Sequence, residues 1–197
     1  MMPVSDRVKI YGTFLDELPT NEEYLTLQFS PARAPRNRRW KNYGMSADFL
    51  GDYFAQFFPG DELPGSKINR QDTARAAISY IANELLENAV KYSDVVADLP
   101  ITITLQLYAE QIVIEVTNHA SPKAVTRYQQ FIETLLTSDL ETLYSDQLEK
   151  TALGSGDSSL GILTMMKDYA AELGWRFQLQ TLHPDVTRVQ VMAQLKV

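Results

Sequence analysis

The chain has 197 residues, of which 45% are hydrophobic and 22% charged, and its formal net charge is −7 at pH 7. This composition suits a globular protein with one sizeable core, and the negative charge argues against general nucleic-acid binding, which needs cationic side chains. The absence of cysteine excludes disulfides, two histidines disfavour a structural zinc site, and no apolar run approaches the roughly 20 residues that span a bilayer. Because the N-terminus does not resemble a signal sequence, we expect a cytoplasmic protein.

The N-terminal residues predict two short strands. Residues 1–23 are treated as an N-terminal extension, with a short strand over 8–11 and no assigned function. Residues 24–29 alternate apolar and polar side chains, which predicts a strand. We expect one domain over 24–197.

A basic run and an aromatic helix follow. The run covers residues 33–41 and reads either as solvated surface or as a contact for an acidic partner or a phosphate. Its basic residues are Arg33, Arg36, Arg38, Arg39 and Lys41. Residues 46–58 predict a helix capped by Ser46. Its aromatic-rich face suits either the core or a homodimer contact.

Residues 69–93 predict a long helix with an informative polar stripe. Ile78, Ile81, Ala82, Leu85, Leu86 and Ala89 form its apolar side. Glu84, Asn88 and Lys91 follow one another at i, i+4 and i+7 on a neighbouring stripe. A carboxylate can accept a proton, a carboxamide oxygen can ligate Mg²⁺, and a lysine can meet a phosphate. The alternative is an ordinary amphipathic helix with a solvated polar face.

The segment Glu84-Leu-Leu-Glu-Asn88-Ala-Val-Lys91 resembles the N box of the GHKL superfamily, E-L-x-x-N-A-x-K. This superfamily contains gyrase, histidine kinases, large heat-shock chaperones and mismatch-repair ATPases. The resemblance implies an ATP-binding domain of the Bergerat fold.

Two alternating segments, 100–107 and 111–117, predict antiparallel strands joined by a turn. Asn118 follows the second strand, where the superfamily has an Asp-x-Gly-x-Gly box that holds adenine. Neither glycine of that box is present here, although an asparagine can still pair with an adenine amino group. The alternative is that Asn118 is a turn residue at a strand end.

Two polar helices come next, over 121–136 and 138–150. Ser121-Pro122 predicts the start of the first, and Ser138 with Glu141 has the spacing of a capping box for the second. In the resemblance, residues 121–160 occupy the place of a mobile lid over the nucleotide.

The segment 153–162 is rich in glycine and precedes a helix predicted over 163–173. Glycines before a helix leave backbone N–H groups facing an anion. The segment resembles the second glycine box, G-x-G-x-G-L-G-L, with Ser159 where a glycine is usual. The matching residues are Gly154, Gly156, Leu160 and Gly161. The alternative is a flexible connection.

Residues 175–182 and 186–195 predict a closing hairpin. The whole pattern predicts a two-layer α/β (α+β) sandwich, in which helices cover one face of a mixed, mostly antiparallel sheet of roughly four to six strands.

The chain most resembles the stand-alone anti-sigma-factor serine/threonine kinases of the SpoIIAB and RsbW type and the SiaB-family protein kinases. This resemblance implies ATP and Mg²⁺ as cofactors, and phosphorylation of a STAS-domain partner in a switch that can involve a sigma factor and a PP2C-type phosphatase. It also implies a role for each site residue. Glu84 would be the general base, Asn88 the Mg²⁺ ligand, Lys91 a phosphate contact and Asn118 the adenine contact, while Gly154, Gly156, Ser158, Ser159, Leu160 and Gly161 would surround the phosphates.

Three hypotheses remain open from the sequence. The first is a serine/threonine kinase or anti-sigma component. The second is a catalytically inactive nucleotide-sensing or protein-binding module, which the missing first glycine box favours. The third is a nucleotide-free adaptor that uses the aromatic helix 46–58 and the basic run 33–41.

Overall fold

A computed structural model describes residues 8–19, 23–30, 36–60, 69–153, 159–183 and 185–196, without the side chains of 36–42. None of the helices described is long and apolar enough to cross a membrane. The elements in chain order are β1 (Val8–Gly12), β2 (Tyr24–Phe29), α1 (Arg36–Ala55), α2 (Arg70–Tyr92), β3 (Ile101–Leu107), β4 (Gln111–Ala120), α3 (Pro122–Thr137), α4 (Leu140–Ala152), α5 (Leu160–Lys167), β5 (Glu172–Leu179) and β6 (Thr187–Lys196).

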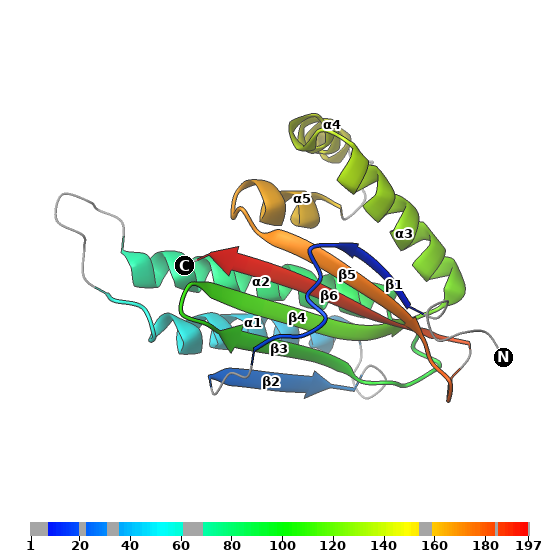
Figure 1. Ribbon diagram of the computed structural model, residues 1–197, viewed down its shortest axis with the longest axis horizontal. Coiled ribbons are helices and arrows are strands. Elements are labelled where there is room, and N and C mark those ends of the chain that lie inside the picture. The colour runs from blue at the N-terminus through cyan, green and yellow to red at the C-terminus, as the bar shows by residue number, and fades with distance from the viewer. Residues whose placement is uncertain are drawn as a thin grey trace.

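The strands form one six-stranded sheet in the order β1-β5-β6-β4-β3-β2 (Figure 1). Every pairing among these strands is antiparallel, so the sheet has no parallel pair within the described residues. The predicted α+β sandwich is confirmed, and its sheet is antiparallel rather than mixed. Local hairpins β3–β4 and β5–β6 supply two of the pairings, and the β4–β6 pairing joins them across the chain.

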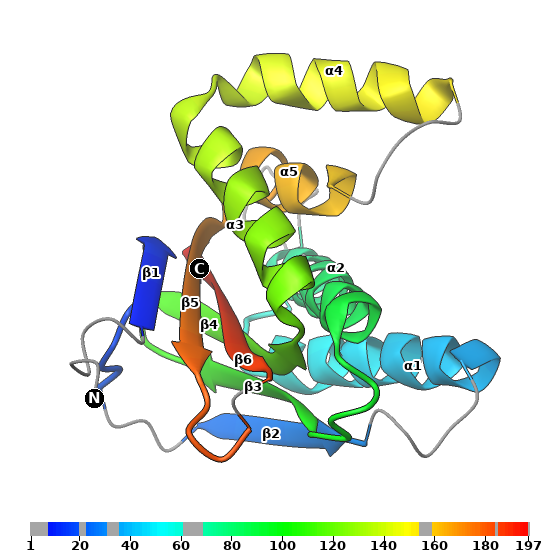
Figure 2. The ribbon, with the colours of Figure 1, turned by 90° about the vertical axis from the view of Figure 1, so that its right-hand side faces the viewer.

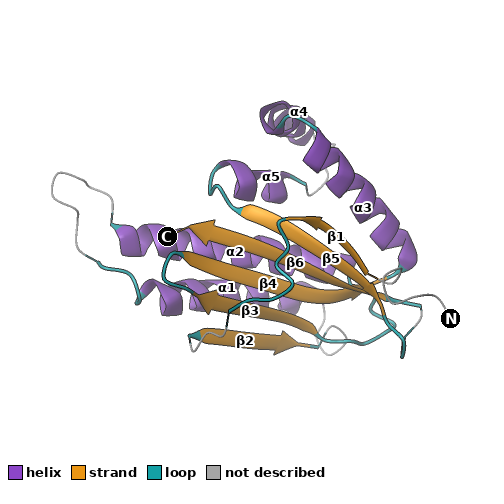
Figure 3. Ribbon diagram, in the orientation of Figure 1, coloured by secondary structure: helices purple, strands orange, loops and turns teal. Residues whose placement is uncertain are grey.

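Helices α1 and α2 cover one face of the sheet, as Figure 3 shows. The predicted apolar stripe of α2 is confirmed, because all six of its residues are buried. They pack against inward side chains of the central strands, including Ile103, Ile114 and Val191. Burial of this stripe, rather than intrinsic helix propensity, holds α2 on the sheet.

The segment after β1 runs across the opposite face of the sheet (Figure 1). The Gln194 side chain donates a hydrogen bond to the carbonyl of Thr13, and the Tyr108 hydroxyl donates to the carbonyl of Pro19 at 3.1 Å. Part of the residues assigned to an N-terminal extension therefore lies on the sheet, and β1 is its edge strand beside β5.

Helix α1 begins ten positions before the predicted helix, at Arg36, so Ser46 lies within it and is not its N-cap. The prediction assigned the basic run to solvated surface or a partner contact and gave it no secondary structure, although Arg and Lys are good helix formers. The helix ends at Ala55. Beyond it, the Phe57 N–H donates to Phe54 O at 3.2 Å, so the chain continues as a tighter turn.

Helix α5 ends earlier than predicted, at Lys167, and β5 begins at Glu172 rather than at Trp175. The change of direction occurs at Ala170, which has a φ of 50°, while the Ala171 N–H donates to Met165 O. This left-handed residue ends the helical turn as a glycine would. No residue pattern indicated this turn, because an alanine rarely takes that conformation.

Two further boundaries differ from prediction. Strand β4 continues through Ala120, so Asn118 lies inside the strand rather than after it. The N-cap of α4 is Asp139, whereas Ser138 is the C-cap of α3. Both side chains can cap, and Asp139 takes the role because its carboxylate reaches the N–H of Thr142.

Candidate functional site

The polar stripe of α2 lies along the second half of that helix. Glu84 and Asn88 are half-buried and Lys91 is exposed. The helix ends at Tyr92, where the hydroxyl of the C-cap residue Ser93 donates to the carbonyl of Ala89 at 2.7 Å. Beside this end, α3 passes over α2 and α5 lies above it (Figure 2).

A cavity of about 320 Å³ lies between these three helices. Its described lining residues are Asn88, Lys91 and Tyr92 of α2; Ala124, Arg127, Tyr128 and Phe131 of α3; and Ser159 and Ile162 at the start of α5. The structure therefore brings together Asn88, Lys91 and Ser159, three of the residues predicted to bind nucleotide.

The cavity is cationic although the chain is acidic. Lys91 and Arg127 line it, and none of the described lining residues is a carboxylate. With a net charge of −7 over the whole chain, this local concentration of positive charge favours an anionic ligand. The sequence analysis missed Arg127, because nothing in the pattern of residues 121–136 shows which side of that helix faces α2.

Aromatic rings form one wall of the cavity. Tyr92 and Tyr128 stack with their centroids 5.9 Å apart, and Tyr128 is also parallel to Phe131 at 6.4 Å. The Trp175 Nε1–H donates to the Tyr128 hydroxyl at 2.9 Å, and burial raises the pKa of Tyr128 well above its usual range. This fixed, neutral ring suits stacking against a planar base.

Asn118 lies behind this wall and is only 4% exposed. Its side-chain amide donates to the carbonyl of Ala89 at 3.2 Å and to the hydroxyl of Ser93 at 3.4 Å, which ties β4 to the last turn of α2. It lines a separate space of about 20 Å³, which is enough for about one water molecule. In this arrangement Asn118 has a structural role, and contact with a base would require Tyr92 and Tyr128 to part.

Glu84 is not among the residues that line the larger cavity, because it faces Gly161. A Cβ on Gly161 would lie 1.8 Å from Glu84 Oε2, so the glycine lets α5 approach this carboxylate in its present position. Burial raises the pKa of Glu84, and the nearby carboxylate of Glu87 raises it further. A raised pKa suits a group that accepts a proton.

The residues predicted as phosphate contacts in the glycine-rich segment are only partly described by the structure. Gly154, Gly156 and Ser158 lie outside the described residues. Ser159 occupies the N-cap position of α5 without a capping hydrogen bond from its side chain, and Leu160 begins the helix. Gly161 is buried against Glu84.

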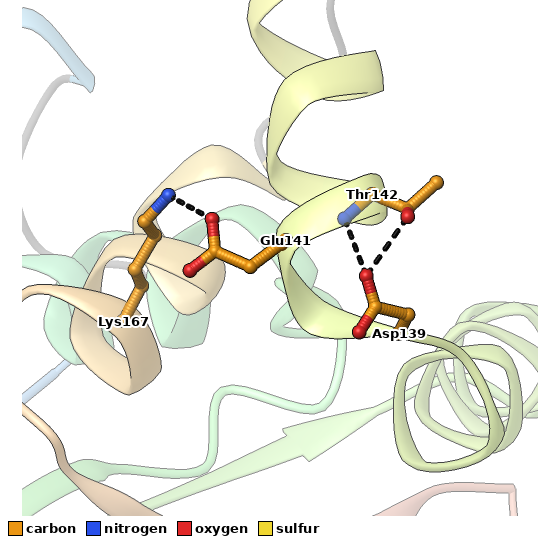
Figure 4. Close-up of polar contacts among 4 residues, drawn as sticks. All are labelled: Asp139, Glu141, Thr142 and Lys167. Carbon is orange, nitrogen blue, oxygen red and sulfur yellow. Dashed lines mark hydrogen bonds and ion pairs between the residues drawn. The ribbon is translucent and has the colours of Figure 1, made fainter.

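The predicted lid consists of helices α3 and α4 with the segment that leads to α5. Lys167 of α5 forms an ion pair with Glu141 of α4, and its ammonium lies 4.4 Å from the ring centroid of Tyr144. Figure 4 shows this pair beside the α4 cap, where Asp139 accepts hydrogen bonds from the N–H and the hydroxyl of Thr142. These exposed contacts hold α4 on α5 weakly.

No group of three or more His, Asp or Glu side chains that could hold a metal occurs among the described residues. Mg²⁺ commonly uses one or two protein oxygens together with substrate phosphates and water. Asn88 has a suitable oxygen and lines the cavity, so the residues present fit a metal that arrives with a nucleotide.

Comparison with known proteins gives a likeness of fold. No family model matches the chain, and no curated protein matches it. Among solved structures, a chain in the crystal structure of the SiaB-SiaC complex from Pseudomonas aeruginosa is 13% identical, with a TM-score of 0.54. The match covers 88% of this chain and 89% of that chain, so the two share the architecture over nearly their whole lengths.

Proposed function

We propose that this chain is a signalling protein that binds ATP with Mg²⁺ in the cavity between α2, α3 and α5. The observation that carries the proposal is the convergence of Asn88, Lys91 and Arg127 on one cavity with an aromatic wall. A carboxamide, two cations and flat rings match the metal, phosphates and base of a nucleotide. The spacing of Glu84, Asn88 and Lys91 in the sequence supports the same ligand.

Within this site each residue has a distinct task. Lys91 and Arg127 neutralise the phosphate oxygens, and Asn88 helps to hold Mg²⁺, which supplies further positive charge to those oxygens when bound. The base packs on Tyr92 and Tyr128, and reaches Asn118 if those rings separate. Gly154, Gly156 and Ser158 remain predicted phosphate contacts beside Ser159, Leu160 and Gly161.

The finer proposal is a serine/threonine kinase that acts on a STAS-domain partner, with a sigma factor or a PP2C-type phosphatase in the same switch. The protein of similar fold was crystallised in a complex of two proteins, which supports a protein partner for this chain as well. Glu84 would accept the proton of the partner hydroxyl. Catalysis would then depend on positioning and charge neutralisation.

A second candidate is a catalytically inactive nucleotide sensor or protein-binding module. The observation that favours it is the position of Glu84, which lies against Gly161 and not on the cavity. Phosphate transfer with Glu84 as the general base would require the start of α5 to move, whereas binding of a nucleotide would not.

Calorimetric titration with ATP and Mg²⁺ tests the binding site. The wild type should bind, whereas Asn88→Ala and Arg127→Ala should each weaken binding by about tenfold or more, since each removes a charged or metal contact. Arg75→Ala is the matched control. Arg75 is an exposed arginine near the start of α2, away from the cavity, and it pairs with Asp52 of α1. Equal binding by all four proteins would contradict the site.

The variant Glu84→Ala distinguishes the kinase proposal from the sensor proposal. If Glu84 is the base, this variant should bind ATP normally and lose phosphate transfer to a purified STAS-domain protein. Transfer that survives the substitution would remove Glu84 from the mechanism. Binding without transfer in the wild type, with every STAS-domain protein of the same organism, would favour the sensor.

A further inference from the structure

A second cavity, of about 280 Å³, lies at the N-terminal end of α2, where the candidate nucleotide site does not reach. Residues of α2, of the paired strands β4 and β6, of the turn after α1 and of the segment after α5 border it. Its volume is close to the lower end of the range of about 300–1,000 Å³ that is typical of small-molecule sites. It therefore suits a ligand of about the size of an amino acid.

The floor of this cavity is apolar and buried. Ile78, Ile112 and Leu195 line it and are 0%, 1% and 5% exposed. Ala74 and Ala77 also line it, and their spacing of three residues places them on one side of α2. Because each of these two side chains is a single methyl group, α2 leaves a hollow that a larger residue at either position would fill.

Two aromatic rings border the same hollow. The aromatic face predicted for residues 46–58 is divided in the structure, since Leu50 and Phe54 are buried in the core, whereas Phe58 is partly buried beside this cavity. The second ring is that of Tyr169, which stacks on Tyr80 of α2 with their centroids 5.0 Å apart. An apolar group in the cavity would contact aliphatic and aromatic side chains together.

Two charged side chains of opposite sign at this cavity have no partner. Arg70 is the first residue of α2, and Asp168 is the C-cap of α5. Both line the cavity, yet neither side chain forms a hydrogen bond or an ion pair with any residue that the structure describes. They do not pair with each other either. One guanidinium and one carboxylate therefore remain available to a ligand.

The neighbouring charged side chains are already paired. Lys196 also lines the cavity, and its ammonium lies 3.3 Å from a carboxylate oxygen of Glu172. Lys167, which precedes Asp168 in the chain, pairs with Glu141 of α4. No described cation is thus left to neutralise Asp168 by an ion pair.

Both unpaired charges lie at the helix end that disfavours them. A positive side chain is unfavourable at a helix N-terminus and a negative one at a helix C-terminus, so Arg70 does not stabilise α2 and Asp168 does not stabilise α5. A ligand carboxylate beside Arg70 would also lie near the positive end of the α2 dipole. A ligand ammonium beside Asp168 would lie near the negative end of the α5 dipole.

We propose that this cavity binds a free α-amino acid with an apolar side chain. Its carboxylate meets Arg70, its ammonium meets Asp168, and its side chain packs over Ala74 and Ala77 against the apolar floor. A ligand with only one of the two charges leaves the other side chain unmatched. The site is independent of nucleotide binding, because it lies at the other end of α2.

Titration of the full chain with L-phenylalanine, followed by heteronuclear NMR, tests the ligand class. Amide signals at the start of α2 and the end of β6 should shift and saturate. L-Phenylalaninamide lacks the carboxylate and N-acetyl-L-phenylalanine lacks the ammonium, so each should bind about tenfold or more weakly. No saturable shift with L-phenylalanine or L-leucine up to about 10 mM, or equal affinity for either derivative, would overturn the proposal.

Arg70→Ala tests which side chain holds the carboxylate. It should weaken binding of L-phenylalanine by about tenfold and leave L-phenylalaninamide unaffected, because that derivative has no carboxylate to lose. Asp168→Asn should likewise spare N-acetyl-L-phenylalanine. Arg75→Ala is the matched control, since Arg75 is an exposed arginine of the same helix that pairs with Asp52 and does not line the cavity. An equal loss of both ligands in Arg70→Ala would indicate a structural role and overturn this assignment.

Ala77→Leu tests the place of the apolar side chain. The larger residue should occupy the hollow and abolish binding of L-phenylalanine, while circular dichroism should show that α2 remains folded. Ala76→Leu is its control, because Ala76 is exposed on the same helix and does not line the cavity. Wild-type affinity in a folded Ala77→Leu variant would overturn the proposed site.

Discussion

The two ends of α2 border cavities of similar size and different chemistry. The cavity at its C-terminal end measures about 320 Å³ and the one at its N-terminal end about 280 Å³. The first has Lys91 and Arg127 with an aromatic wall. The second is lined mainly by apolar side chains such as Phe58, Ile78 and Leu195.

The charged groups around the N-terminal cavity are of both signs. Arg70 and Lys196 line it together with Asp168, so it lacks the single sign of charge that attracts an anion. Volume therefore does not separate the two cavities, whereas the balance of charge does. A phosphate-bearing ligand is expected only at the C-terminal end of α2, and the following predictions test how different the two ends are.

The largest effect is expected from Gly161→Ala at the C-terminal end. A Cβ there meets Glu84 Oε2 at 1.8 Å, so the flexible Glu84 carboxylate must turn away from its present position, and the free energy of unfolding should fall by about 1–2 kcal/mol. Urea denaturation measures it.

Two variants check the cause of that loss. In a Glu84→Ala background the same substitution should be nearly neutral, because the clash is gone. Gly44→Ala is the control, since its nearest neighbour would be 4.0 Å away, and an alanine inside a helix should stabilise it by up to about 1 kcal/mol. A full loss in the double variant would show that Glu84 is not the obstacle.

The next effect compares two N-cap positions. Asn69 caps α2 through hydrogen bonds from the N–H groups of Gln71 and Asp72, so Asn69→Ala should lower the free energy of unfolding by about 1 kcal/mol. Ser159 occupies the same position in α5 without such a bond. Thermal unfolding should therefore find Ser159→Ala nearly unchanged, while calorimetry should find weaker nucleotide binding. Similar destabilisation by both would contradict the observed capping.

A pH titration examines Glu84 itself. Its pKa is raised in the folded protein above the ordinary value of 4.5, so the folded state holds its proton more tightly than the unfolded state. Stability linked to this group is then lost as pH rises from about 4.5 through the raised pKa. Glu84→Gln should be more stable than wild type near pH 7 and should show a smaller decline over that window. Identical pH profiles of unfolding would contradict the raised pKa.

The smallest effect is expected in α4. Glu141→Gln removes the ion pair with Lys167, but both groups lie at the surface, and the midpoint of urea unfolding should not change. Hydrogen exchange in α4 should become faster, while α2 should exchange as before. Slower or unchanged exchange in α4 would show that this pair does not hold the helix.

Much of the fold could be predicted because the pattern of apolar residues within each segment indicates its secondary structure. The buried stripe of α2 has a clear helical period, and the hairpin strands alternate strictly. The errors occurred at element boundaries, where several residues in a row could begin or end the element. Ser46 can cap a helix, yet it lies inside α1, and Ala170 takes a left-handed conformation without being a glycine.

The candidate site was predicted in part for the same reason. Asn88 and Lys91 lie on one stripe of one helix, so their proximity follows from helical geometry. Arg127 is 36 positions further along the chain than Lys91, and its meeting with Lys91 depends on how α3 crosses α2. Such a crossing is set by packing, which a single sequence does not display.

By itself the sequence determined the order and type of the secondary elements, the apolar side of α2 and the row of polar groups beside it, because each depends on neighbours in the chain. The tertiary structure decided the rest. It turned Glu84 toward Gly161, bound the amide of Asn118 at the end of α2 and brought Arg127 to the cavity. It also left Phe49 and Tyr53 at the surface. Each of these outcomes depends on which elements, far apart in the sequence, pack against one another. That packing is defined only in the folded chain.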